Sequence, residues 1–109
     1  GRRLSVSGGG KAQWQLSENE RTLRTDKGAS VELTPIEVQL LGALVRAGEA
    51  GCDRAALREA ASLEDIEERS IDAAIFRMRK KIEKVTGRPA PIKTRHGFGY
   101  EILSHVDLR

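Results

Sequence analysis

The sequence predicts a single α+β domain, and three observations support this prediction. Residues 1–33 alternate short apolar and polar positions, residues 34–86 carry apolar side chains at helical spacing, and residues 91–103 alternate again around a glycine-rich turn. The chain has 109 residues, a length that favours one domain with one ordinary core. We therefore expect residues 1–109 to form an N-terminal antiparallel sheet, a three-helix core and a C-terminal β-hairpin.

The first part of the chain is expected to form a sheet of three or four short strands. Residues 4–6 and 12–16 alternate apolar and polar side chains, the pattern of half-buried strands. Residues 22–25 and 29–33 flank a turn in which Gly28 can supply a positive φ angle. Trp14 is expected to pack in the core or on a face of this sheet.

Two helices are marked by residues that cap helix N-termini. Thr34 can cap the first helix, Pro35 suits its first position, and Glu37 completes a capping box. Asp53 is expected to cap a second, short and alanine-rich helix that runs to about Ser62. The first helix is expected to bury four side chains, namely Ile36, Leu40, Leu41 and Leu44.

The third helix has two sides of contrasting character. Spacings of four and three residues place one set of side chains on a core-facing stripe: Ile71, Ile75, Met78, Ile82 and Val85. At about 100° per residue, a mainly basic set gathers on the opposite side: Arg69, Ala73, Phe76, Arg77, Lys80 and Lys84. Arg79 and Lys81 lie on the flanks, and Asp72 is expected to pair within the helix or to act as a cap.

The net charge of +3 conceals two oppositely charged segments. Residues 49–68 contain seven acidic and two basic side chains, whereas residues 69–100 contain nine basic and two acidic ones. Such a segregated basic stretch is typical of a protein that binds a polyanion. The alternative is an ordinary solvated helix face.

A basic helix followed by a basic hairpin suits double-stranded DNA. An α-helix fits the major groove, and a two-stranded ribbon can reach the adjacent backbone or the minor groove. Arginines can bond to guanine edges while lysines neutralise phosphates. Phe76 is expected to be partly exposed on this helix, where it could touch a thymine methyl group. The alternative is that its ring folds back over a neighbouring element.

Three motifs, in their order and spacing, resemble one known family over essentially the whole chain. They are Leu33-Thr34 with Glu37 and Leu40-Leu41, the segment Arg69-Ser70-Ile71-Asp72-Ala73-Ala74-Ile75-Phe76-Arg77-Met78-Arg79-Lys80-Lys81, and the segment Ile92-Lys93-Thr94-Arg95-His96-Gly97-Phe98-Gly99-Tyr100. The sequence resembles the OmpR/PhoB-type winged-helix effector domain of response regulators. The resemblance implies a winged helix-turn-helix whose third helix is the recognition helix and whose C-terminal hairpin is the wing.

The resemblance also implies a function and partners. It implies sequence-specific binding of double-stranded DNA by the output domain of a two-component transcriptional regulator, with the third helix in the major groove and the wing on the minor groove or backbone. A phosphorylatable receiver domain is expected upstream. Gly1-Arg2-Arg3 would then be the remnant of the linker between the two domains. Binding as a tandem dimer, possible contact with RNA polymerase and a bacterial cytoplasmic location, nucleoid-associated when bound, are further implications. No cofactor is expected.

Carried over residue by residue, the resemblance names a contact set with Arg77 as the first choice for a base contact. The expected DNA-binding residues are Arg69, Ser70, Ala73, Phe76, Arg77, Arg79, Lys80, Lys84, Thr94, Arg95, His96 and Gly97. Arg69, Ser70 and Thr94 match positions at which members of the family touch the DNA backbone. Arg79 matches a position that binds phosphate or pairs with an acid in the family. The acidic loop before the third helix is expected to contact the transcription machinery through Glu64, Asp65, Glu67 and Glu68.

Two positions depart from the family pattern. His96 stands at the wing tip where an arginine is common, and Arg95 cannot simply replace that arginine because neighbouring strand residues point to opposite sides. Phe76 stands at a position that is commonly polar, which puts the family's usual base preference in doubt.

Other functions find less support. The serines and the two histidines form no motif with a base or an orienting acid, so an enzyme is not expected. The single cysteine, Cys52, excludes an internal disulfide and is expected to be an inert thiol at the core edge. No metal-ligand spacing or membrane-length apolar run is present. The main alternative is a winged-helix module that binds protein instead of DNA through the acidic stretch 59–68.

Overall fold

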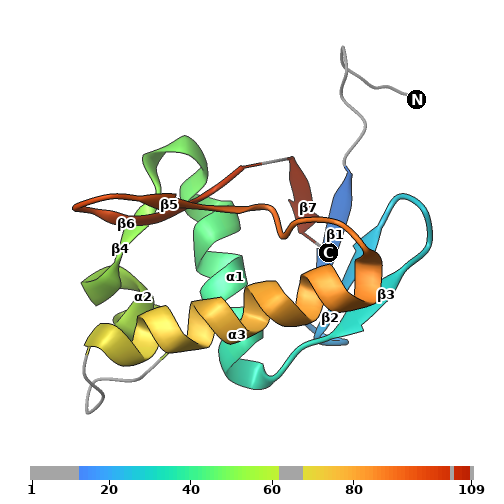
Figure 1. Cartoon of the computed structure of the whole chain (residues 1–109), viewed down its shortest axis with the longest axis horizontal. Helices are drawn as coiled ribbons and strands as arrows, with labels where there is room; N and C mark the ends of the chain where they lie inside the picture. Colours follow the sequence, from blue (N-terminus) through green and yellow to red (C-terminus); the bar gives the residue numbers. More distant parts are fainter. Residues whose placement is uncertain (1–12, 62–67, 104, 109) are drawn as a thin grey trace.

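The computed structural model describes residues 13–61, 68–103 and 105–108. These residues form an α+β domain of three helices and two small sheets, in which α1 lies between the sheets (Figure 1). The elements in chain order are β1 (Trp14–Ser17), β2 (Thr22–Thr25), β3 (Ser30–Glu32), α1 (Pro35–Ala47), the 3-10 turn η1 (Gly48–Ala50), β4 (Cys52–Asp53), α2 (Arg54–Ala60), α3 (Glu68–Thr86), β5 (Ile92–Arg95), β6 (Gly99–Ile102) and β7 (Val106–Leu108).

The N-terminal sheet has the strand order β3-β2-β1-β7. Its first three strands are antiparallel, as predicted, and Gly28 closes the hairpin between β2 and β3 with φ +93°. The fourth strand was not predicted: β7 returns from the C-terminal end and pairs with β1 in parallel, with Trp14 opposite Val106. The strand predicted at residues 4–6 lies outside the described residues.

Helices α1 and α2 begin as their capping residues predict. The Thr34 hydroxyl accepts a hydrogen bond from the Glu37 backbone amide, and the Glu37 carboxylate accepts one from the Thr34 amide. Asp53 caps α2 by accepting a hydrogen bond from the Ala56 amide, and the helix ends at Ala60, slightly earlier than predicted. These bonds satisfy amides that the first turn of a helix leaves without internal partners.

Most of the predicted helical core is confirmed. Seven of the side chains predicted to be buried are no more than 1% exposed: Leu40, Leu41, Leu44, Ile71, Ile75, Met78 and Ile82. Ile36 was wrongly predicted to be buried and is 39% exposed, because it lies in the first turn of α1 and side chains point back toward a helix N-terminus. Val85 was also wrongly predicted to be buried: it lies in the last turn of α3 and is 50% exposed.

The wing is the hairpin of β5 and β6, and β4 pairs with it to make a three-stranded sheet of order β4-β6-β5. The sequence predicted the hairpin but not β4. The wing turn is tight: Gly97 has φ +77°, and the Phe98 amide donates to the Arg95 carbonyl. Gly99 lies so close to β4 that a Cβ atom would come within 2.2 Å of the Cys52 carbonyl oxygen.

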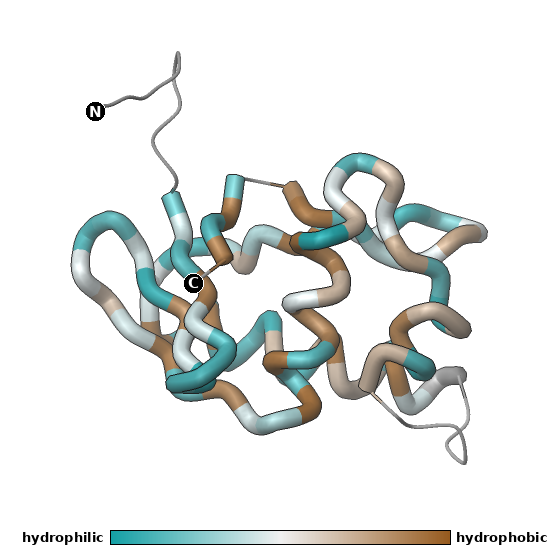
Figure 2. The backbone as a smooth tube through the Cα atoms, turned by 180° about the vertical axis from the view of Figure 1, so that it is seen from behind, coloured by the Kyte–Doolittle hydropathy of each residue, from teal (hydrophilic) through white to brown (hydrophobic). Residues whose placement is uncertain are grey.

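The layout places α3 along one side of the domain, with its first turns near α2 and its last turns near β3 (Figure 1). Behind it, α1 packs against α2, α3 and β6. In Figure 2 the hairpin between β2 and β3 is mostly hydrophilic, whereas hydrophobic segments recur along the strands and helices that enclose the core. Both α3 and the wing are therefore fixed to one common core.

Candidate nucleic-acid interface

The outer face of α3 carries exposed side chains opposite the buried stripe. Five of the residues predicted to face DNA are exposed here: Ala73, Phe76, Arg77, Lys80 and Lys84. We call these five the outer face of α3. Ser70 is half-buried. Arg69 belongs to the same helix, but its side chain lies outside the described residues. Because four residues of the opposite stripe are locked in the core, the outer face cannot rotate away from solvent without unfolding the domain.

Two basic residues on the flanks of α3 are held by partners inside the domain. Arg79 donates a hydrogen bond from Nη1 to the Thr94 hydroxyl of β5 at 3.1 Å. Lys81 pairs through Nζ with Glu37 Oε1 of α1 at 2.6 Å. Thr94 was predicted to contact the DNA backbone, and Arg79 to bind phosphate or to pair with an acid; the structure brings the two side chains together. Arg79 uses one of the five N–H donors of its guanidinium for this bond.

A carboxylate on α3 joins three elements. Asp72 accepts hydrogen bonds from Arg54 Nε at 2.8 and 3.0 Å, and from the Tyr100 hydroxyl of β6 at 2.5 Å. The expectation that Asp72 would pair within its own helix or act as a cap is therefore wrong, since both partners come from other elements and Asp72 lies inside α3. Burial and the bond to Asp72 raise the pKa of Tyr100 from 10.0 to about 12, and the same carboxylate raises the pKa of Arg54. The network fixes α3 relative to α2 and the wing.

At the wing tip, Arg95 and His96 have different environments. The prediction from strand alternation does not apply to this pair, because β5 ends at Arg95 and His96 lies in the turn that follows. Arg95 Nη1 donates to the Ala50 carbonyl at 2.9 Å, and its guanidinium lies 4.7 Å from the centre of the Phe98 ring. His96 and Gly97 are exposed. The Arg95 guanidinium therefore braces the wing against η1, whereas His96 is presented to solvent.

Three of the acidic residues predicted to contact the transcription machinery, Glu64, Asp65 and Glu67, lie outside the described residues. Glu68 is the first residue of α3, but its side chain is likewise not described. Along the sequence, these four residues fall between the end of α2 at Ala60 and the first turn of α3.

The other residues weighed in the sequence have structural roles. Trp14 is 2% exposed, which confirms its place in the core. Cys52 is buried and its thiol lies 3.6 Å from the Ala43 carbonyl. Burial and the neighbouring Asp53 raise the pKa of Cys52, which disfavours a reactive thiolate. No group of histidine, cysteine or carboxylate side chains that could hold a metal ion occurs within residues 13–61, 68–103 and 105–108.

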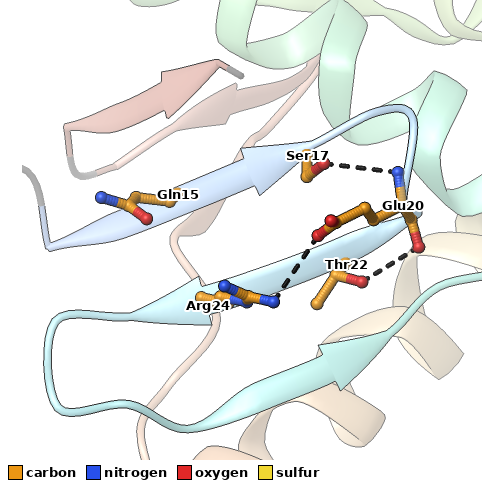
Figure 3. A pocket seen from close by; sticks show the side chains of 5 residues that line it. All are labelled: Gln15, Ser17, Glu20, Thr22 and Arg24. Carbon is orange, nitrogen blue, oxygen red and sulfur yellow. Dashed lines mark hydrogen bonds and ion pairs between the residues drawn. The ribbon is translucent and has the colours of Figure 1, made fainter.

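A polar depression on strands β1 and β2 is a separate feature (Figure 3). Its residues bond to one another: the Thr22 hydroxyl donates to the Glu20 backbone carbonyl, the Glu20 backbone amide donates to the Ser17 hydroxyl, and the Arg24 side chain pairs with the Glu20 carboxylate at 3.5 Å (Figure 3). It contains none of the residues predicted to contact DNA. Over the described part of the chain, we find no helix with the length and apolar character needed to cross a membrane.

Comparison with known proteins identifies the family. The model of the family described as "Transcriptional regulatory protein, C terminal" matches residues 28–102. The chain belongs to this family. It is therefore an OmpR/PhoB-type winged-helix DNA-binding domain, of the kind that forms the C-terminal part of transcriptional regulatory proteins. The matched residues include α1, α2, α3 and the wing.

Individual relatives agree with this family. The regulatory protein VirG of Rhizobium rhizogenes is 36% identical over 99 residues, which cover 89% of this chain and 41% of that protein. The chain thus spans about two fifths of the length of this relative. One similar solved structure is the DNA-binding domain of the response regulator AdeR in complex with an intercistronic region. It superposes with a TM-score of 0.74 at 19% sequence identity, and the match covers 84% of this chain and 95% of the AdeR chain. The DNA-binding domain of Bacillus subtilis CssR has a TM-score of 0.66 at 22% identity, with coverages of 82% and 98%.

Proposed function

We propose that α3 enters the major groove of double-stranded DNA with its outer face toward the bases. One observation carries this proposal: Arg77, Lys80 and Lys84 are all exposed on that face, while the opposite side of the helix is locked in the core. An α-helix fits the major groove, where each base pair presents a distinct pattern of donors, acceptors and methyl groups. The protein would thereby recognise a particular DNA sequence.

The roles within the outer face follow from side-chain chemistry. Arg77 is our candidate for a base contact, because a guanidinium can bond bidentately to the O6 and N7 atoms of guanine. Lys80 and Lys84 would neutralise phosphates as point charges. Ala73 would permit close approach of the helix backbone. Arg69 and Ser70, at the start of α3, would contact the DNA backbone.

The wing would contact the backbone or the minor groove next to the site of α3. Arg79 and Thr94, joined by their hydrogen bond, would share a phosphate, because the guanidinium retains further donors. His96 and Gly97 are exposed at the wing tip and would lie closest to the groove. Arg95 would act chiefly by bracing the wing, since its guanidinium is already bonded to the Ala50 carbonyl.

The wider assembly is part of the same proposal. A receiver domain would precede this domain in a bacterial cytoplasmic regulator, and two copies would bind DNA in tandem. Glu64, Asp65, Glu67 and Glu68 would contact RNA polymerase, because a strongly acidic loop attracts basic protein surfaces. Reversing these four charges should abolish transcription activation and leave DNA binding unchanged. Loss of DNA binding in the same variant would contradict this role for the loop.

The salt dependence of duplex binding tests the function directly. If about five phosphates are neutralised, the logarithm of affinity should fall against the logarithm of salt concentration with a slope of about −4 to −5. A module that binds protein instead of DNA would show no such salt-dependent affinity for a duplex. That result would favour the alternative, in which the acidic stretch 59–68 meets a basic partner.

A further inference from the structure

Phe76 is an exposed aromatic ring within an otherwise small and basic surface. Its side chain is 59% exposed, although the residue lies in the middle of a helix whose other large apolar side chains are mostly buried. Single exposed apolar residues are common in proteins, so exposure alone does not assign a role. The residues around the ring and the anchoring of the helix that bears it do indicate one.

The surroundings of Phe76 point to a nucleic acid as its partner. The Lys80 ammonium lies 5.5 Å from the centre of the ring, and Arg77 and Lys84 are exposed on the same face. A ring that shares its face with three cationic side chains is poorly suited to a basic or purely apolar protein surface. A DNA duplex can contact both kinds of side chain, since its phosphates neutralise the cations while the base edges in its groove contact the ring.

The part of α3 that bears Phe76 is anchored on both sides of this residue. Asp72, four residues earlier on α3, is bonded to Arg54 and Tyr100, and Arg79, three residues later, is bonded to Thr94. Residues three and four apart are neighbours on a helix surface. The strip of α3 that bears Phe76 is therefore anchored to α2 and to the wing. Such preorganisation of the helix reduces the entropy that is lost when this surface meets a partner.

The chemistry of the major groove selects the contact. Phe76 has neither a hydrogen-bond donor nor an acceptor, and the C5-methyl group of thymine is the apolar group that the base edges present in this groove. Ala73, one turn earlier, adds a second small apolar surface. We propose that Phe76 is a specificity-determining residue that packs against a thymine methyl group in the major groove. This inference rests on the proposed insertion of α3 into that groove.

Deoxyuridine provides the test, because it lacks only the methyl group and keeps the pairing and hydrogen-bonding atoms of thymine. A duplex is first selected from a randomised pool with the wild-type chain, and each thymine is then replaced in turn by deoxyuridine. At one or two positions this replacement should weaken binding about fourfold, the effect expected for one buried methyl group. Phe76→Ala should bind the thymine and deoxyuridine duplexes equally, and Phe76→Leu should retain part of the preference.

Phe98→Ala is the matched control, since Phe98 is also exposed but lies in the wing, where its ring faces the Arg95 guanidinium. This variant should keep the full loss of affinity on deoxyuridine replacement. The inference is overturned if the wild-type chain binds every deoxyuridine duplex as tightly as the parent, or if Phe76→Ala retains the wild-type preference. Either result leaves the proposed function intact as long as binding still falls with salt. Selection that yields no preferred duplex would overturn both proposals.

Discussion

The Tyr100 hydroxyl, in the wing, donates a hydrogen bond to the Asp72 carboxylate on α3. Asp72 also holds Arg54 at the start of α2. A single carboxylate thus connects both helices of the helix-turn-helix with the wing. If α3 and the wing contact DNA together, this network sets the geometry with which they do so.

Titration of Tyr100 tests the network. Because burial and the bond to Asp72 raise its pKa from 10.0 to about 12, the folded state binds this proton more tightly than the unfolded state. The stabilisation is complete below pH 10 and is lost as the pH rises through about 12. Tyr100 is the chain's single tyrosine, so tyrosinate absorbance reports this group alone and should have its midpoint near 12.

Asp72→Asn is the informative variant for this titration. Removing the negative charge should lower the Tyr100 midpoint only part of the way toward 10.0, because burial is the larger cause of the raised pKa. A midpoint that does not change in Asp72→Asn would show that the carboxylate has no influence on the tyrosine.

Gly99→Ala should destabilise the domain through a clash. The new methyl group would come within 2.2 Å of the Cys52 carbonyl oxygen and would force β6 away from β4. We expect a loss of about 1–3 kcal/mol in the free energy of unfolding, the usual range for overpacking. Urea denaturation measures this quantity.

Gly97→Ala provides a contrast two residues away. Nothing lies within 4 Å of the position its methyl group would take, so only the backbone strain at φ +77° remains. That strain should lower stability by about 1–2 kcal/mol. The backbone amides between β4 and β6 should keep their wild-type rates of hydrogen exchange in this variant. Faster exchange there would show that the pairing of β4 with β6 depends on the wing turn.

Arg79 and Thr94 should have separable effects on DNA binding. Arg79→Ala removes a charge as well as the bond to the wing, so affinity should fall for all sequences and the magnitude of the salt slope should decrease by about 1. Thr94→Val removes the hydroxyl but no charge, and should weaken binding with an unchanged slope. Equal slopes for Arg79→Ala and the wild-type chain would exclude a phosphate contact by Arg79.

Lys80→Ala and Lys84→Ala should each weaken binding of all duplexes alike and reduce the magnitude of the salt slope by about 1. Arg24→Ala is the charge-matched control, because Arg24 is exposed on the N-terminal sheet beside Glu20 (Figure 3) and away from α3. Its salt slope should equal that of the wild-type chain. A similar decrease in all three variants would indicate an effect of total charge and not of the outer face of α3.

Local signals explain how much of this fold the sequence could predict. The capping box at Thr34 and Glu37 and the spacing of Ile71, Ile75, Met78 and Ile82 depend on neighbouring residues only, and the structure confirms them. Strands β4 and β7 were missed because two or three residues carry no period of their own, and each forms only by pairing with a distant strand.

The candidate site divides in the same way. Helical periodicity correctly predicted which side of α3 is exposed, including Phe76. It could not predict that Arg79 reaches Thr94, 15 residues away, or that Asp72 meets Tyr100, 28 residues away. Such pairs depend on how the wing folds back against α3. An acidic residue amid a basic helix was the available signal for a partner on another element, and the sequence alone did not name that partner.

Methylation interference with Arg77→Ala tests the central claim most directly. Methylation of guanine N7 blocks an acceptor in the major groove, whereas methylation of adenine N3 blocks one in the minor groove. Our account predicts guanine N7 interference at the site of α3, with loss of that interference and of about 1–3 kcal/mol of discrimination at one base pair in Arg77→Ala. Interference confined to adenine N3, or an unchanged guanine pattern in Arg77→Ala, would contradict insertion of this face into the major groove.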